Sequence, residues 1–224
     1  MNKHGIGYTI DLLIFALLVS LSFTVLFTFS QPNAEISTKI YAMSFTRNAL
    51  LALLNSTTDQ FGGFSYQAGF QVPEISGQTP LYLALRNLGH KTMGELLAED
   101  VLLNLQLKIG SRTVATIWSN EDMNNKLSFL LKSILDNLAG RKFGYRFVVK
   151  ATPVKNNIVS FDFNLLIENL SPSGTKLCRE TSLLSLPISN EELISLAENR
   201  LGFSLPQHLE TNPVIEIGLE LWSR

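Results

Sequence analysis

The longest apolar run of the chain extends from Ile10 to Phe29, and no charged residue occurs between Leu12 and Ala34. A helix rises about 1.5 Å per residue, so about 20 residues cross the hydrocarbon core of a bilayer. A cleavable secretory signal has a shorter apolar region, followed by small residues that the sequence after Phe29 does not offer. The run therefore predicts a transmembrane helix that the mature chain retains, in preference to a signal that is removed.

The charges that flank this run predict its orientation. Lys3 and the amino terminus precede the run, whereas Glu35 and Lys39 follow it and roughly cancel each other. Positive charge tends to remain on the cytoplasmic side of a membrane. We therefore expect a single-pass protein of the cell membrane, in contact with membrane lipid, with its N-terminus in the cytoplasm and its C-terminal domain outside.

Helical periodicity returns after Pro32, where Asn33 is suited to cap a helix. The apolar residues that this periodicity assigns to one face are Ile36, Ile40, Met43, Leu50, Leu53 and Leu54. The pattern divides the chain into a leader and membrane anchor (1–32), an amphipathic stalk helix (33–56) and an extracytoplasmic α+β domain (57–224).

Two helices are expected in the first half of this domain. Thr92 and Glu95 have the spacing of a capping box, which opens a helix that extends to about Leu105. The clearest helix covers 120–139, because apolar residues recur there with a period near 3.6 and Gly140 then ends it.

The remaining segments of the first half are less regular. A glycine-rich stretch, 56–80, reads as loop with a short strand around Phe64–Val72. The segment 107–117 fits either a helix or a strand, and the sequence does not decide between them.

Alternation of apolar and polar residues dominates the last third of the chain. It predicts strands over 145–151, 158–168, 176–186 and 214–222, with a helix over 189–200 that ends at Gly202. This order predicts an antiparallel meander with a helix inserted before its last strand. The predicted fold class is α+β: an N-terminal transmembrane helix continues into a helical stalk, followed by an outer domain of helices packed on a small antiparallel sheet.

Composition and motifs exclude several classes of function. The net charge of −1 gives no electrostatic basis for binding nucleic acid. Cys178 is the only cysteine, which excludes an intramolecular disulfide and a cysteine-based metal cluster. The three histidines lie far apart without a second metal ligand nearby, and no nucleophile, phosphate-binding or dinucleotide motif occurs. We therefore expect neither an enzyme nor a cofactor or metal site, and we interpret the acidic pairs Glu99-Asp100 and Glu191-Glu192 as solvated charge.

The residues before the apolar run read Lys-His-Gly-Ile-Gly-Tyr-Thr-Ile-Asp, from Lys3 to Asp11. This leader resembles the class III signal of type IV pilins and their archaeal relatives. The resemblance implies that a leader peptidase cuts after a glycine and leaves the apolar segment on the mature subunit. Cleavage after Gly7 makes Asp11 the fourth mature residue, and cleavage after Gly5 makes it the sixth. The family places its acid fifth, so both glycines are candidates.

Asp11 has two interpretations. The resemblance implies that it meets the amino terminus of a neighbouring subunit and so sets the registry between packed helices. Alternatively, Asp11 belongs to the first turn of a helix, where negative charge is favourable, and the two glycines are flexible leader residues.

Small or weakly polar residues recur at every fourth position of the run, at Ala16, Ser20, Thr24 and Thr28. Such a stripe permits close packing of helices, although hydroxyl residues also occur in spans by chance, since they bond to their own helix. Two sequons, at Asn55 and Asn169, suit glycans on the surface of an exported domain.

The sequence thus favours a membrane-anchored, extracytoplasmic, pilin-like structural protein at the cell surface. It would be a subunit or assembly component of an archaeal-type filament. Its expected partners are further copies or other pilin-like subunits and a leader peptidase, and no nucleic acid. The alternative is a single-span receptor or accessory protein whose outer domain binds a ligand or a partner membrane protein.

Overall fold

The computed structural model describes residues 20, 34–71, 81–116, 120–202, 204–205 and 209–224. The chain divides into two compact units, Met1–Tyr41 and Ala42–Arg224. Helix α2 (Ala34–Asn55) begins in the first unit and ends in the second, which contains all the other elements below.

The predicted transmembrane helix is contradicted by this structure. Among the described residues, no helix is both long enough and apolar enough to cross a bilayer. Helix α2 has 22 residues, but Glu35, Lys39 and Arg47 interrupt its apolar sequence. This finding also contradicts the single-pass membrane location and the N-terminal part of the predicted fold class. The predicted span itself, Ile10–Phe29, lies outside the described residues except for Ser20, which is exposed.

The core of the second unit is a seven-stranded antiparallel sheet with the order β4-β3-β6-β5-β9-β7, in which β8 also pairs with β5. Its strands are β3 (Gln106–Ile109), β4 (Arg112–Thr116), β5 (Gly144–Lys155), β6 (Val159–Asn169), β7 (Lys176–Ser185), β8 (Glu210–Thr211) and β9 (Val214–Trp222). The prediction of a small meander is therefore wrong. Strand β9 lies between β5 and β7, because its nearly continuous burial suits a central strand better than an edge.

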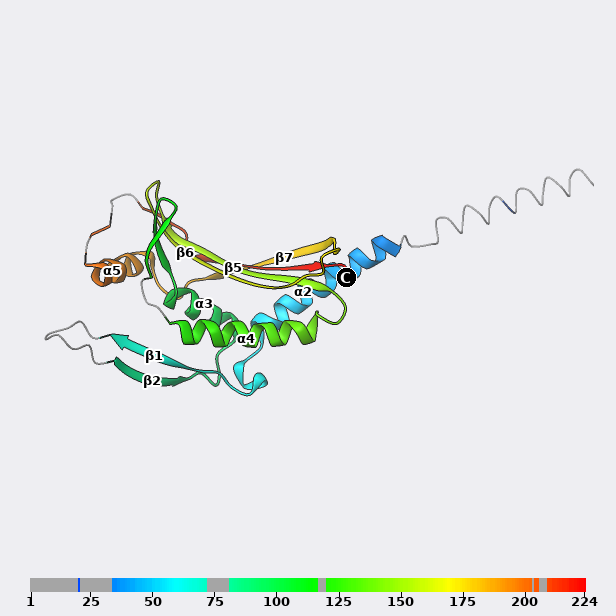
Figure 1. Cartoon of the computed structure of the whole chain (residues 1–224), viewed down its shortest axis with the longest axis horizontal. Coiled ribbons are helices and arrows are strands. Elements are labelled where there is room, and N and C mark those ends of the chain that lie inside the picture. The colour runs from blue at the N-terminus through cyan, green and yellow to red at the C-terminus, as the bar shows by residue number, and fades with distance from the viewer. Residues whose placement is uncertain (1–19, 21–33, 72–80, 117–119, 203, 206–208) are drawn as a thin grey trace, which may run out of the picture. The chain divides into compact units, whose positions relative to one another are not determined.

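Three helices lie on the same side of this sheet in Figure 1: α3 (Met93–Leu103), α4 (Glu121–Leu138) and the second-unit part of α2. The buried residues of α4 follow one another at intervals of four: Met123, Leu127, Leu131 and Leu135. They share the core with the inward side chains of the central strands, such as Phe147 of β5 and Leu219 of β9, both fully buried. The regular apolar spacing that predicts α4 is thus the spacing that packs it.

Local sequence motifs correctly predicted several helix ends. The capping box between Thr92 and Glu95 is confirmed, and Ser189 caps α5 (Asn190–Leu201) in the same way. Gly202 ends α5 in the left-handed conformation, with a φ of 74°. The undecided segment 107–117 contains most of β3 and all of β4, and these two strands form a hairpin.

A separate hairpin precedes α3. The predicted strand around Phe64–Val72 corresponds to β1 (Ser65–Gln71), and it pairs with β2 (Leu81–Asn87), which the sequence did not predict. A short 3-10 helix, η1 (Thr58–Phe61), connects α2 to this hairpin.

Candidate functional site

One face of helix α2 is buried within the second unit. Ala42, Thr46 and Leu53 are almost fully buried. The Thr46 hydroxyl donates to the Ala42 carbonyl oxygen at 2.6 Å and lies 3.0 Å from the sulfur of Cys178 on β7. This side of the helix therefore serves the core of the domain.

A second apolar stripe follows another side of α2. Its apolar members are Ile36, Ile40, Met43 and Leu51, and the charged Arg47 occupies the position between the last two. Ile36 and Ile40 of the first unit are 55% and 63% exposed, and Met43 and Leu51 of the second are 51% and 46% exposed. The predicted single apolar face is therefore wrong, because it combined Ile36, Ile40 and Met43 with leucines that point into the core.

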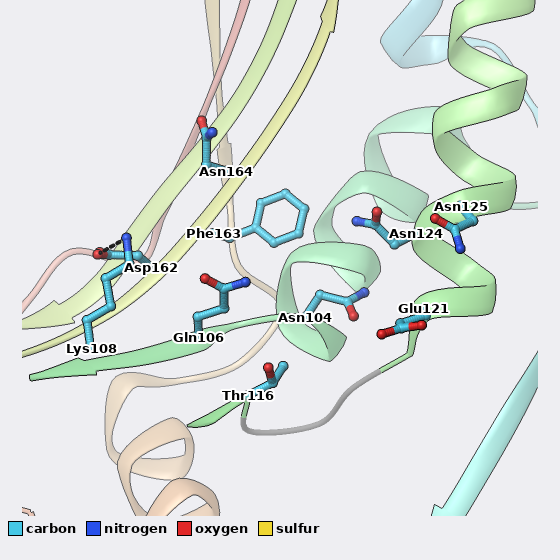
Figure 2. A pocket seen from close by; sticks show the side chains of 10 residues that line it. All are labelled: Asn104, Gln106, Lys108, Thr116, Glu121, Asn124, Asn125, Asp162, Phe163 and Asn164. Atoms are coloured by element: carbon cyan, nitrogen blue, oxygen red, sulfur yellow. Dashed lines mark ion pairs between the residues drawn. The ribbon is translucent and has the colours of Figure 1, made fainter. Parts of the chain in front are cut away.

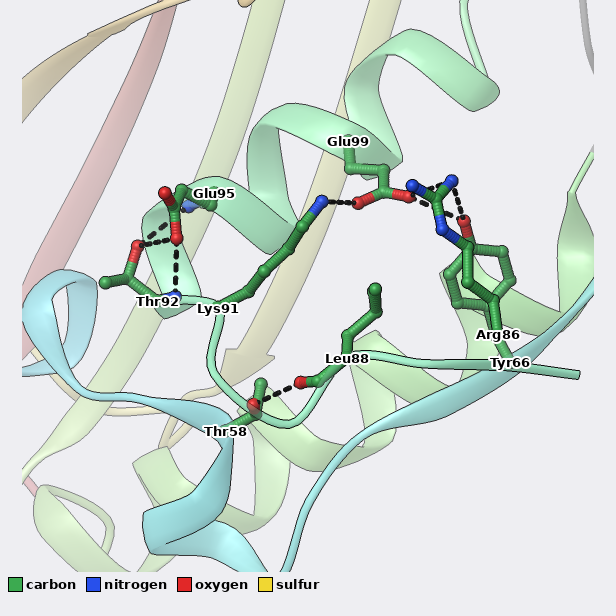
Figure 3. Close-up of polar contacts among 8 residues, drawn as sticks. All are labelled: Thr58, Tyr66, Arg86, Leu88, Lys91, Thr92, Glu95 and Glu99. Carbon is green, nitrogen blue, oxygen red and sulfur yellow. Dashed lines mark hydrogen bonds and ion pairs between the residues drawn. The ribbon is translucent and has the colours of Figure 1, made fainter.

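An ion-pair cluster connects α3 to the β1–β2 hairpin (Figure 3). One carboxylate oxygen of Glu99 accepts from the Tyr66 hydroxyl at 2.6 Å and lies 3.0 Å from the Arg86 guanidinium. The other lies 2.5 Å from the Lys91 ammonium. Burial alone would raise the pKa of Glu99, but the bonds from Lys91 and Tyr66 and the two positive charges hold that pKa below its ordinary value. Burial and the bond to Glu99 raise the pKa of Tyr66 to about 12.

The same cluster borders an apolar groove of about 790 Å³ between α3, the end of α2 and β7. Leu51, Leu102 and Leu184 supply part of its wall. Leu51 also belongs to the exposed stripe of α2, so the stripe is continuous with the groove within the second unit.

A polar pocket of about 420 Å³ lies where the end of α3 and the start of α4 face strands β3, β4 and β6 (Figure 2). Its described lining consists mainly of amides and carboxylates: Asn104, Gln106, Lys108, Thr116, Glu121, Asn124, Asn125, Asp162, Phe163 and Asn164. Lys108 and Asp162 pair at 3.2 Å, which neutralises the one cation of this set.

Asp100 of α3 binds two of these amides by hydrogen bonds. It is fully buried, and its two carboxylate oxygens accept from the side-chain amides of Asn104 at 2.8 Å and Asn124 at 3.1 Å. Burial raises the pKa of Asp100 to about 7, and the two amide bonds offset only part of this effect. The carboxyl has no cation partner among the described residues.

The interpretation of Glu99 and Asp100 as solvated charge is wrong. The side chains of Glu99 and Asp100 do point apart, as expected for adjacent helix positions. However, Asp100 is buried and Glu99 is partly buried, so neither is fully solvated. One local signal was present, because Asn104 follows Asp100 by one helical turn. The other partner, Asn124, comes from a different helix, and nothing in the local sequence indicates that contact.

Most of the residues that the pilin resemblance singles out cannot be placed. Gly5, Gly7, Asp11, Ala16, Thr24 and Thr28 lie outside the described residues. Of the two sequons, Asn55 is exposed at the end of α2, where its amide donates to the Leu51 carbonyl oxygen. Asn169 is half-buried, and its amide nitrogen, the atom that carries an N-linked glycan, donates to Asp136 at 2.9 Å.

Comparisons with known proteins identify no relative. No protein-family model, no curated protein and no solved structure matches this chain. Any function must therefore be argued from the residues themselves. Among the described residues, no group of histidine, cysteine, aspartate or glutamate side chains has the geometry to hold a metal ion.

Proposed function

We propose that this chain is a pilin-like structural subunit whose copies associate through α2 in a surface filament or in its assembly machinery. The observation that carries the proposal is the second apolar stripe of α2. A helix with apolar residues on several sides is normally packed on those sides, and exposed apolar surface of this kind is typical of an interface. The domain itself leaves Met43 and Leu51 half-exposed.

The spacing of the stripe supports a helix as its partner. Intervals of three and four residues place side chains along one seam, which is how two nearly parallel helices interlock. Arg47 lies on this seam, and two copies aligned in register would bring their arginines together. A staggered arrangement, such as that between successive subunits of a filament, avoids this repulsion.

The N-terminal sequence supports the same proposal. Gly5 and Gly7 are the candidate cleavage sites of a leader peptidase, and Asp11 would then lie close to a new amino terminus. Within a bundle of apolar helices, a charge pair contributes little net stability, because desolvation offsets much of the attraction. It would instead fix the registry, since a slipped subunit leaves a charge unpaired. The proposal includes no catalytic role.

Substitutions on two sides of α2 test the association. We expect Met43→Glu to reduce co-purification of two differently tagged full-length copies at least tenfold, because a charge would have to be buried in the seam. Asn48→Glu is the matched control, since Asn48 is also exposed but lies on another side of α2. Both variants should unfold at the same denaturant concentration as the wild type. Equal co-purification of the two variants would contradict association through this stripe.

Leader processing tests the resemblance itself. When the chain is co-expressed with an archaeal prepilin peptidase, we expect either Gly7→Leu or Gly5→Leu to prevent the gain in gel mobility that accompanies cleavage. The reason is that the peptidase needs a residue without a bulky side chain before the cut bond. The glycine variant that still permits cleavage is the control for the other. Unchanged mobility of the wild type, or cleavage of both variants, would exclude a class III signal here.

A further inference from the structure

We propose that the polar pocket between α3, α4 and strands β3, β4 and β6 binds a small, neutral, polyhydroxylated ligand, such as one sugar residue of a glycan. Its volume of about 420 Å³ lies within the range of about 300–1,000 Å³ that is typical of small-molecule sites. This proposal does not depend on the association through α2, because the residues concerned lie elsewhere in the second unit.

The chemistry of the lining matches hydroxyl groups. A side-chain amide offers a donor and an acceptor side by side, and a hydroxyl group of a sugar is likewise both donor and acceptor. Gln106 and Asn125 are exposed, and neither has a side-chain hydrogen-bond partner among the described residues. Thr116 and Glu121 add a hydroxyl group and a further acceptor to the same space. The pocket therefore presents several uncommitted polar groups to an occupant.

Part of the lining is oriented in advance. The amide nitrogens of Asn104 and Asn124 face Asp100, and each donates to one of its carboxylate oxygens. The oxygen of Asn104 accepts from the backbone N–H of Asn120 at 3.0 Å, which fixes that amide completely. The orientation of Asn124 leaves its oxygen as the group available for a ligand. A fixed acceptor costs less entropy on binding than one that must first be ordered.

The charges of the pocket favour a neutral ligand over an anion. Lys108 is the one cation of the described lining, and it is already paired with Asp162 at 3.2 Å. Glu121 adds a second negative charge. A phosphate or carboxylate ligand would therefore meet net repulsion, whereas a neutral polyol would not.

Phe163 of β6 borders the pocket, but only 6% of the residue is exposed, so most of its ring belongs to the core of the domain. Figure 2 shows the ring of Phe163 pointing into the space bordered by Gln106, Asn104 and Asn124. The pocket therefore offers a sugar mainly polar groups, to which Phe163 adds a small apolar surface.

Ligand-observed saturation-transfer NMR on the full chain tests the proposal with four probes: glucose, galactose, mannose and N-acetylglucosamine. We expect at least one of them to bind, and we expect Gln106→Ala to weaken that binding about tenfold, because it removes a donor and an acceptor. Gln60→Ala is the matched control, since Gln60 is an exposed glutamine of η1 outside the pocket. It should leave the affinity unchanged.

Three results would overturn the proposal. The first is that none of the four sugars shows saturation transfer. The second is that Gln106→Ala binds as tightly as Gln60→Ala, which would place the sugar elsewhere. The third is that inorganic phosphate or calcium ions, and none of the sugars, shift the backbone resonances of 104–108 and 121–125.

Discussion

Glu99 and Asp100 are neighbours on α3, and their carboxyl groups have opposite electrostatic environments. Glu99 lies among Lys91, Arg86 and Tyr66, all of which favour its charged form. Asp100 points to the other side of the helix, where only the neutral amides of Asn104 and Asn124 reach it. The pKa of Glu99 is held below its ordinary value, whereas burial raises the pKa of Asp100 to about 7. Burial acts on both, so the presence of a cation decides the direction of the shift.

The comparison also separates two uses of a buried carboxyl. Glu99 connects elements that are distant in the sequence, since Tyr66 and Arg86 belong to the β1–β2 hairpin. Asp100 connects α3 to the first turn of α4 and orients the amides above it. Glu99 is therefore expected to stabilise the fold at neutral pH. Asp100 is expected to reduce stability there, in exchange for a defined geometry at the base of the polar pocket.

The largest expected effect is that of Asp100→Asn. A pKa raised from 3.8 to about 7 corresponds to about 4 kcal/mol of stability. Because the folded state binds the proton more tightly, stability falls as the pH rises from about 4 to about 7, and the full cost is present above pH 7. Asparagine has no charge to bury, although one neighbouring amide must turn to pair with it. We therefore expect urea denaturation to show a more stable variant at pH 8, with no such gain at pH 4.

Asp122→Asn is the control for this experiment. Hydrogen bonds from the backbone N–H of Gln67 and from Lys126 lower the pKa of Asp122, so its charge is favourable in the folded state. This variant should lose stability at neutral pH and recover relative to the wild type as the pH falls below about 4. If the free energy of unfolding of the wild type and of Asp100→Asn depends on pH in the same way, the charge of Asp100 does not destabilise the folded state.

The elements that the sequence predicted well are those with local causes. The spacing of Met123, Leu127, Leu131 and Leu135 identifies α4, and Ser189 and Gly202 mark the ends of α5. The last strand, Val214–Trp222, has the predicted bounds. Its place between β5 and β7 was not predicted, because alternation shows that a segment is a strand but not which strands it joins.

The candidate sites depend on contacts that the sequence does not display. The pocket collects side chains from α3, α4, β3, β4 and β6, which are separated by up to 60 residues. The exposed stripe of α2 was misjudged for a related reason. Ile40 and Leu50 are both apolar and helical, and only the packed structure shows that Leu50 is buried and Ile40 is not. Periodicity alone assigns apolar residues to a face, but it does not say which of two faces the domain covers.

The smallest expected effect is that of Glu99→Gln, which removes the charge and keeps most of the shape. Because the stabilising form of Glu99 is the ionised one, its contribution is present above pH 4.5 and is lost as the pH falls through its lowered pKa. Arg86 is 54% exposed and Lys91 36%, so solvent screens both ion pairs, and we expect a loss of about 1 kcal/mol at pH 7.

The sharper measurement for this variant is the titration of Tyr66, followed through its ring resonances in NMR. Burial is the largest single cause of its pKa of about 12, and the hydrogen bond and charge of Glu99 raise that pKa further. Glu99→Gln should therefore lower the pKa of Tyr66 only part of the way towards 10. Glu95→Gln is the control, because Glu95 belongs to the capping box of the same helix and does not contact Tyr66. If both variants leave the titration of Tyr66 unchanged, Glu99 does not act on Tyr66, and the cluster in Figure 3 is no more than a set of screened surface pairs.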